Sequence, residues 1–113
     1  VNQSVMIYEG TYETVQQPGH ARDIMKAAMQ EVIQVAQKEN VPITQADFDE
    51  YLRLLDTLSP AGMPSMRQDG LAHRKSEVEL FAGTVLALAE KHKIDAPVNR
   101  KIYETILTME RAY

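Results

Sequence analysis

Two polar residues in the middle of the chain are the strongest candidates for chemistry. Ser65 follows Pro64 at the head of a short segment, and Glu77 precedes the longest apolar stripe. A hydroxyl and free N–H groups at a helix start suit a carboxylate ligand, while a carboxylate in a helix's first turn is favoured by the macrodipole. The two residues therefore indicate a site for a small anion beside a directed carboxylate. Each also has a plainer interpretation, Ser65 as an N-cap and Glu77 as an ordinary first-turn residue.

Other polar groups surround these two. The segment from His73 to Lys75, with Arg67 a little before it, is the one basic cluster. Such a cluster is commonly a solvated loop, although beside a cleft it would raise the local concentration of an anion. Gln68 and Asp69 are interpreted as residues that shape the turn. The three histidines have no metal-ligand spacing, so no metal site is predicted.

The element that must position Glu77 is a helix over residues 77–91. Ser76 is a suitable N-cap, and Glu79 stands three residues later in capping-box spacing. Apolar residues recur behind them at helical intervals, namely Val78, Phe81, Ala82, Val85, Leu88 and Ala89. This pattern places Glu77 in the first turn.

Helical periodicity also accounts for the rest of the chain. It predicts further helices over residues 1–8, 21–39, 44–58 and 65–72, and a last one from about Pro97. Gly10 is expected to end the first in a left-handed conformation, and Thr44 to cap the third with Asp47. Residues 11–20 read as an irregular or single-turn segment. The residues predicted to face inward from the third helix are Phe48, Tyr51, Leu52, Leu55 and Leu58, and from the last Ile102, Ile106, Met109 and Tyr113. No segment alternates like a strand, so the fold class predicted is an all-α bundle of five or six helices.

Composition narrows the class of protein. At 113 residues, with 44% hydrophobic and 25% charged residues, the chain is expected to fold as one globular domain. A net charge of −4 disfavours a nucleic-acid binder, and no apolar run is long enough for a membrane helix. The absence of cysteine and of a signal-peptide pattern favours a cytoplasmic protein. The chain starts at Val1, inside what reads as a helix, so we expect it to be a piece of a longer protein.

The motifs together resemble the C-terminal domain of ketopantoate reductase, also called 2-dehydropantoate 2-reductase. The resemblance covers nearly the whole chain, and the matching residues are Ser65-Met66-Arg67-Gln68-Asp69 (family pattern Ser-Met-x-Gln-Asp), Ser76-Glu77, Gly83 and Pro97-Val98-Asn99. The resemblance implies a helical fold like the C-terminal domain of 6-phosphogluconate dehydrogenase-type reductases. Residues 1–113 would be a single substrate-binding domain, and the N-terminal Rossmann domain that binds NADPH would lie outside this chain.

The resemblance also implies roles for three residues. Glu77 would hydrogen-bond the reacting oxygen of a small 2-keto acid and orient a general-acid lysine, Ser65 would hold the substrate carboxylate, and Asn2 would line the same cleft. The lysine would lie upstream of Val1, and the chain has no Gly-x-Gly-x-x-Gly loop, so the chain by itself is expected to be inactive. The positions of Tyr12, Ala82 and Glu79 depart from residues common in the family, which leaves a different 2-keto acid open.

A second hypothesis is a non-catalytic interaction module. If the first helix lacks its natural neighbours, the apolar residues Val5, Met6 and Ile7 would be uncovered and would favour a homodimer.

Overall fold

The computed structural model describes residues 1–113 and contains only helices. In chain order they are α1 (Asn2–Ile7), α2 (Tyr12–Gln16), α3 (His20–Lys38), α4 (Gln45–Asp56), α5 (Ser65–Leu71), the π-helix η1 (Glu79–Gly83), α6 (Thr84–Lys91) and α7 (Pro97–Arg111). The all-α bundle is confirmed. The count exceeds the prediction because α2 forms within the segment expected to be irregular or single-turn. None of these helices combines the length and apolar character needed to cross a bilayer.

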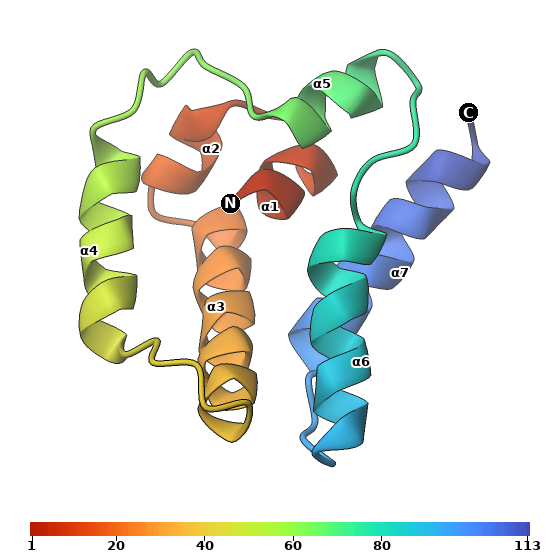
Figure 1. Ribbon diagram of the computed structural model, residues 1–113. Helices are drawn as coiled ribbons and strands as arrows, with labels where there is room; N and C mark the ends of the chain where they lie inside the picture. Colours follow the sequence, from red (N-terminus) through yellow and green to blue (C-terminus); the bar gives the residue numbers. More distant parts are fainter.

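Helix α3 is the central element of the bundle. In Figure 1 it stands between α4 on one side and the pair α6 and α7 on the other, while α1, α2 and α5 lie at one end. The helix predicted over residues 21–39 is confirmed, and Ala28, Val35 and Ala36 on one face of it are buried. Helix α1 contacts α3, α5 and α7, so the first residues of the chain lie within the bundle.

The principal core joins α1, α3, α5, η1 and α7. Its buried members are Met6, Ala28, Met66, Val78, Ala82, Ile102 and Ile106. Burial of each large side chain contributes about 1.5–3 kcal/mol, so this cluster is what holds the short helices α1 and α5 in place. Val5 and Met6 are 0% exposed, and Ile7 packs against the same cluster. The expectation that these three residues would be uncovered was therefore wrong. Met6 and Ile7 pack in the core shared with α5 and α7, and Val5 packs against residues of α2, α3 and α4.

Four helices end in the same motif, with a residue other than glycine in the left-handed conformation. Glu9, Asn40, His73 and Lys93 have φ between 51° and 58°. At the first of these, the N–H of Gly10 donates to the carbonyl of Val5, five residues back, as in a Schellman cap. The prediction that Gly10 itself would be left-handed was thus wrong by one position. Gly10 is needed for a different reason, since a Cβ there would lie 2.0 Å from Oγ1 of Thr14.

Helix α4 begins as predicted but is less deeply buried than predicted. The Thr44 N–H donates to Asp47 Oδ2 at 2.9 Å, and the Asp47 N–H returns a bond to Thr44 Oγ1, which confirms the capping box. Phe48 is buried, but Tyr51 and Leu58 are 44% and 37% exposed. The prediction that Tyr51 and Leu58 face inward was therefore wrong, and the buried face of α4 is narrower than predicted.

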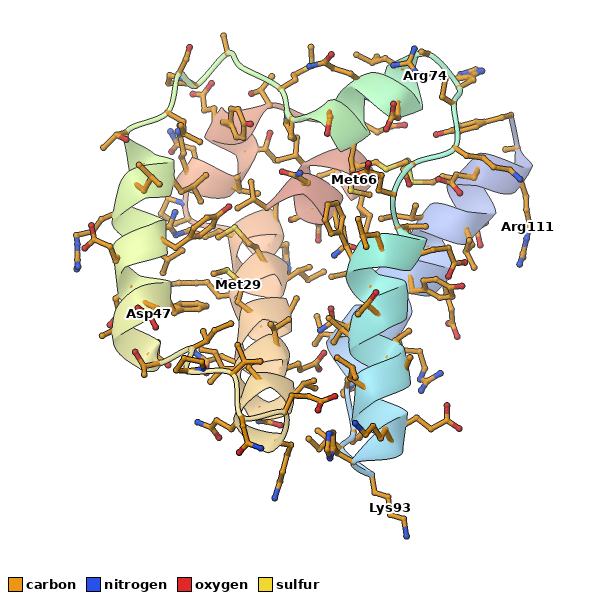
Figure 2. The ribbon with its side chains drawn as sticks, viewed as in Figure 1. Met29, Asp47, Met66, Arg74, Lys93 and Arg111 are labelled. Atoms are coloured by element: carbon orange, nitrogen blue, oxygen red, sulfur yellow. The ribbon has the colours of Figure 1, made fainter.

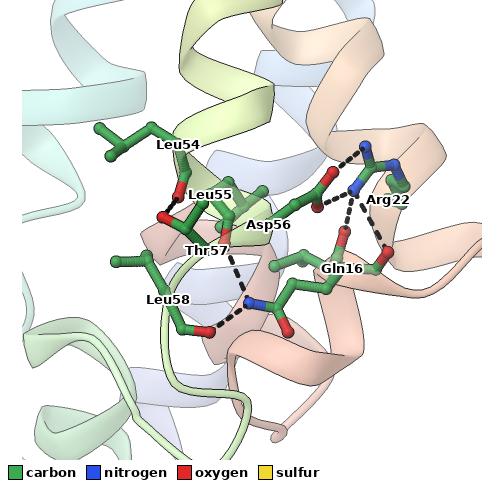
Figure 3. A network of polar contacts seen from close by, with 8 residues as sticks. Gln16, Arg22, Leu54, Leu55, Asp56, Thr57 and Leu58 are labelled. Carbon is green, nitrogen blue, oxygen red and sulfur yellow. Dashed lines mark hydrogen bonds and ion pairs between the residues drawn. The ribbon is translucent and has the colours of Figure 1, made fainter.

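Polar contacts hold the other end of α4. Figure 3 shows Gln16 Nε2 donating to the carbonyl oxygens of Leu55 and Leu58, both at 2.9 Å. In the same view, Arg22 Nη1 pairs with Asp56 Oδ1 at 3.0 Å. These bonds tie the last turn of α4 to α2 and α3, beside the buried side chain of Leu55.

Candidate functional site

The three predicted site residues lie on different elements around α1. Asn2 is the first residue of α1, Ser65 is the first residue of α5, and Glu77 lies two residues before η1. Helix α1 packs against α5, and Gln3 of α1 accepts a hydrogen bond from Ala82 of η1. The fold therefore brings the three elements to one end of the bundle. No hydrogen bond joins the three side chains to one another.

The start of the helix after Glu77 differs from the predicted capping box. The Ser76 N–H and hydroxyl both donate to Oε1 of Glu110, at 2.7 and 2.6 Å. The Glu79 carboxylate accepts from the Tyr103 hydroxyl. Both predicted capping partners, Ser76 and Glu79, are thus bonded to residues of α7. The hydrogen bond from Tyr103 to Glu79 is the main cause of the raised pKa of Tyr103. The capping-box prediction was wrong because tertiary partners replace the local ones.

The backbone of Glu77 is fixed, although its side chain has no partner. Its carbonyl oxygen accepts from the N–H groups of Leu80 at 2.9 Å and Phe81 at 3.1 Å, so the first helical turn starts at Glu77. The preceding residue, Ser76, is anchored to Glu110 of α7. The carboxylate of Glu77 is exposed and makes no hydrogen bond or ion pair. A carboxylate on a fixed backbone at a helix start is available to an external donor.

Ser65 presents a similar situation on α5. Pro64 occupies the N-cap position, and no side chain caps this helix, so the N-cap interpretation of Ser65 was wrong. Its side chain is exposed, and its hydroxyl makes no hydrogen bond. Gln68 and Asp69 have local partners instead, Gln68 Nε2 donating to the carbonyl of Met63 and Asp69 accepting from Arg74. Those contacts agree with a turn-shaping role.

A cavity of about 410 Å³ opens between the start of α1, α3 and the helix formed by η1 and α6. Its lining is mostly apolar and comprises Val1, Asn2, Gln3, Ser4, Met25, Ala28, Met29, Val32, Tyr51, Leu80, Phe81, Thr84, Val85, Asn99 and Ile102. Asn2 therefore faces a cavity, whereas Ser65 and Glu77 are not part of its wall. Leu80 and Phe81, which belong to the turn that starts at Glu77, do line the cavity.

Asn99 is a cavity residue to which the sequence assigned no role in the site. Its side-chain NH₂ donates to the carbonyl of Ala28 at 3.2 Å and to Glu31 Oε1 at 2.6 Å. Because both partners are acceptors, the orientation of the amide is settled, and its carbonyl oxygen is the group left for the cavity. Glu31 also accepts from the backbone N–H groups of Val98 and Asn99, at 2.9 and 2.8 Å. This buried carboxylate fastens α3 to the first turn of α7.

The basic cluster is partly neutralised by its neighbours. Arg67 Nε donates to the carbonyl of Gly10 at 3.3 Å, and Arg74 pairs with Asp69 at 3.2 Å. Figure 2 shows Arg74 in the loop just after α5, away from Met66, which is buried on that helix. His73 stacks on Tyr113 with 4.9 Å between ring centroids.

Tyr113 departs from the inward-facing position predicted for it. Helix α7 ends at Arg111, and Tyr113 is 40% exposed. Its ring packs on the loop after α5 and not in the core. Ile102 and Ile106 are buried as predicted, and Met109 packs at the edge of the core.

The fold is shared with parts of longer solved proteins. A dimeric ketopantoate reductase from Staphylococcus aureus has a TM-score of 0.91 and 20% identity, covering 99% of this chain and 39% of that one. The structure of a D-mandelate dehydrogenase with NADH and anilino(oxo)acetate has a TM-score of 0.86 and 19% identity, covering 98% and 47%. These likenesses establish the shared fold.

The chain belongs to the family of ketopantoate reductase PanE/ApbA C-terminal domains, whose sequence pattern matches residues 1–110. The 2-dehydropantoate 2-reductase of Aquifex aeolicus is 26% identical over 108 residues, which are 92% of this chain and 34% of that protein. The enzyme of the same name from Vibrio cholerae is 29% identical over 90 residues, 80% of this chain and 30% of that protein. The chain thus spans about a third of the length of these relatives.

Proposed function

We propose that this chain is the substrate-binding and partly catalytic domain of an NADPH-dependent 2-dehydropantoate 2-reductase, which converts ketopantoate to pantoate in the cytoplasm on the route to pantothenate and coenzyme A. One observation carries the proposal. Glu77 lies in the family motif with its backbone fixed from both sides, by Ser76 to Glu110 and by the turn to Phe81, while its carboxylate has no partner within the chain. A carboxylate held in this way is suited to act on another group.

The proposed chemistry assigns a role to each site residue. Carbonyl reduction develops negative charge on the substrate oxygen, which a lysine ammonium upstream of Val1 would protonate. Glu77 would keep that lysine charged and aimed, because an opposite charge nearby favours the protonated amine. The unpartnered hydroxyl of Ser65 would donate to the substrate carboxylate, and Asn2 would contact the substrate from the cavity wall.

We expect the nucleotide to be bound mainly outside this chain. The sequence has no Gly-x-Gly-x-x-Gly loop, so NADPH would be bound by the part of the parent protein that corresponds to the unmatched two-thirds of the relatives. The cofactor would supply the hydride. This domain would hold the 2-keto acid and direct the proton donor.

The experiment compares the intact parent protein with its Glu77→Gln variant, following NADPH oxidation with ketopantoate. We expect kcat/KM to fall by a factor of about 100 or more, a loss of roughly 2.7 kcal/mol of transition-state stabilisation. Glu90→Gln is the matched control, because Glu90 is also exposed and lies on α6. Full activity of Glu77→Gln would refute the role of Glu77, and an intact protein inactive toward ketopantoate but active with another 2-keto acid would reassign the substrate.

A homodimer, or a non-catalytic interaction module, is the alternative to the reductase function. The surface that supports it lies on α4 and not on the predicted residues Val5, Met6 and Ile7. Helix α4 exposes Tyr51, Leu54 and Leu58, with Leu54 58% exposed, at spacings that place them on one face. We expect light scattering of the parent protein to show a dimer that Leu54→Glu converts to a monomer. A wild-type monomer at high concentration would contradict the homodimer.

A further inference from the structure

The helix that follows Glu77 starts with an irregular hydrogen-bond pattern. The N–H of Gly83 donates to the carbonyl of Val78, five residues back, at 3.0 Å. In an α-helix that carbonyl would accept from Ala82. Residues Glu79–Gly83 are therefore a π-turn, which contains one residue more than an α-helical turn, and Ala82 N–H has no partner in the backbone ladder.

Gln3 supplies the missing acceptor. Its side-chain Oε1 accepts from the N–H of Ala82 at 3.1 Å, across 79 residues of sequence. Ala82 is 0% exposed, so without Gln3 this N–H would be buried without a partner, at a cost that favours a change of structure. A side chain that enters the helical ladder in this way is a known cause of an irregular turn.

Two further contacts are adapted to the π-turn. The Glu79 carboxylate accepts from Tyr103, and a Cβ at position 83 would lie 2.8 Å from Glu79 Oε2. The absence of a side chain at Gly83 therefore leaves room for the Glu79 carboxylate beside it. These contacts fix the outer side of the turn, whereas Gln3 fixes the side that faces α1.

The π-turn determines how Glu77 is placed relative to α1. If Ala82 N–H returned to Val78, the turn would lose its extra residue. The residues that precede the π-turn would then rotate by about 100° around the helix axis and shift by about 1.5 Å along it relative to α6. Glu77 and Leu80 lie on that displaced part, while Asn2 is adjacent to Gln3. One side chain thus links the register of the Glu77 turn to the helix that carries Asn2.

We propose that Gln3 is a positioning residue, which holds the π-turn and thereby keeps Glu77 in register with Asn2 for the reaction. This inference rests on the proposed reductase function, because it assigns Gln3 an effect on catalysis through Glu77. It predicts that the oxygen of Gln3, as an acceptor for Ala82, is the group that matters, and not its NH₂.

The test uses the intact parent protein with Gln3→Met, which keeps the length and removes the acceptor, and Gln3→Glu, which keeps an acceptor. We expect Gln3→Met to lower kcat by about 10-fold or more in folded protein, since small misplacements of catalytic groups have effects of this size. Gln3→Glu should stay within about 3-fold of wild type. Hydrogen exchange of the Ala82 amide should be faster in Gln3→Met and protected in Gln3→Glu. Gln34→Met on the exposed face of α3 is the control.

A double-mutant cycle separates positioning from simple stabilisation. In a Glu77→Gln background, Gln3→Met should have little further effect on kcat, because both changes act on the same group. The proposal would be overturned if Gln3→Met lowered kcat by the same factor in the wild-type and Glu77→Gln backgrounds, or if it left the wild-type kcat unchanged. The reductase function would stand in either case. A Gln3→Glu protein with a protected Ala82 amide and lost activity would also overturn it, since the NH₂ would then act on substrate directly. No turnover by the wild-type protein with any 2-keto acid would refute the reductase function, and the role of Gln3 in it as well.

Discussion

Glu31 and Glu77 are two glutamates that meet the start of a helix, and the structure treats them in opposite ways. Glu31 is 7% exposed and accepts three hydrogen bonds, from Val98 N–H, Asn99 N–H and the Asn99 side chain. Glu77 is exposed, and its carboxylate accepts none. The helix start at α7 is thus saturated by the protein's own carboxylate, whereas the carboxylate before η1 is left unoccupied. A saturated group supports structure, and an unsaturated group on a fixed backbone can act on a ligand.

The contrast extends to the way each backbone is held. The carboxylate of Glu31 itself joins α3 to α7 through its hydrogen bonds. Around Glu77 the fastening is done by neighbours, Ser76 with Glu110 on one side and Gln3 with Ala82 on the other. This division leaves the Glu77 side chain free of structural work, which is the arrangement expected of a residue that must bind and release a partner.

The largest expected effect concerns stability and separates the two glutamates. Glu31→Ala removes the acceptor of two backbone N–H groups and of one of the two hydrogen bonds donated by the Asn99 side chain, so we expect it to lower the free energy of unfolding by about 3 kcal/mol or more. Glu77→Ala should change it by less than about 0.5 kcal/mol, because its side chain has no contacts to lose. Urea denaturation followed by circular dichroism measures both, with Gln34→Ala as a control on α3. Similar losses for Glu31→Ala and Glu77→Ala would contradict the comparison.

A smaller effect is expected when the support of Glu77 is removed. Glu110→Ala takes the acceptor away from both the N–H and the hydroxyl of Ser76. We expect a loss of about 1–2 kcal/mol in the free energy of unfolding. Hydrogen exchange at the Ser76 amide should also become faster. Glu110→Gln retains an oxygen and should keep most of the protection. An unchanged exchange rate in Glu110→Ala would mean that the Glu77 backbone is held by other contacts.

Local sequence was sufficient for features whose partners lie within one helical turn. The Thr44 and Asp47 capping box formed as predicted because both groups belong to the same turn. The buried stripe of α3 formed because a helix of 19 residues shows its period clearly. The same reasoning failed at Ser76 and Glu79, which bond instead to Glu110 and Tyr103 of α7.

The candidate site shows the same division. Ser65 and Glu77 were predicted as site residues because their types and spacing match a family motif, and the structure leaves both side chains exposed and without hydrogen-bond partners. Asn2 was found by the same resemblance, and it lines the cavity. Gln3 was missed, and Asn99 was noticed only as part of a family motif. Their partners Ala82 and Glu31 lie 79 and 68 residues away, and no local pattern marks such pairs.

The sequence by itself determined the helical class, most helix positions and the motif that contains Ser65 and Glu77. These features depend on periodicity, capping and spacing, which are properties of neighbouring residues. The tertiary structure alone decided that Glu31 and not Glu77 is buried, that Val5 and Met6 are covered, and that Gln3 supports a π-turn. Those outcomes depend on which donors and acceptors meet across the bundle, because a buried polar group must find a partner wherever the fold provides one.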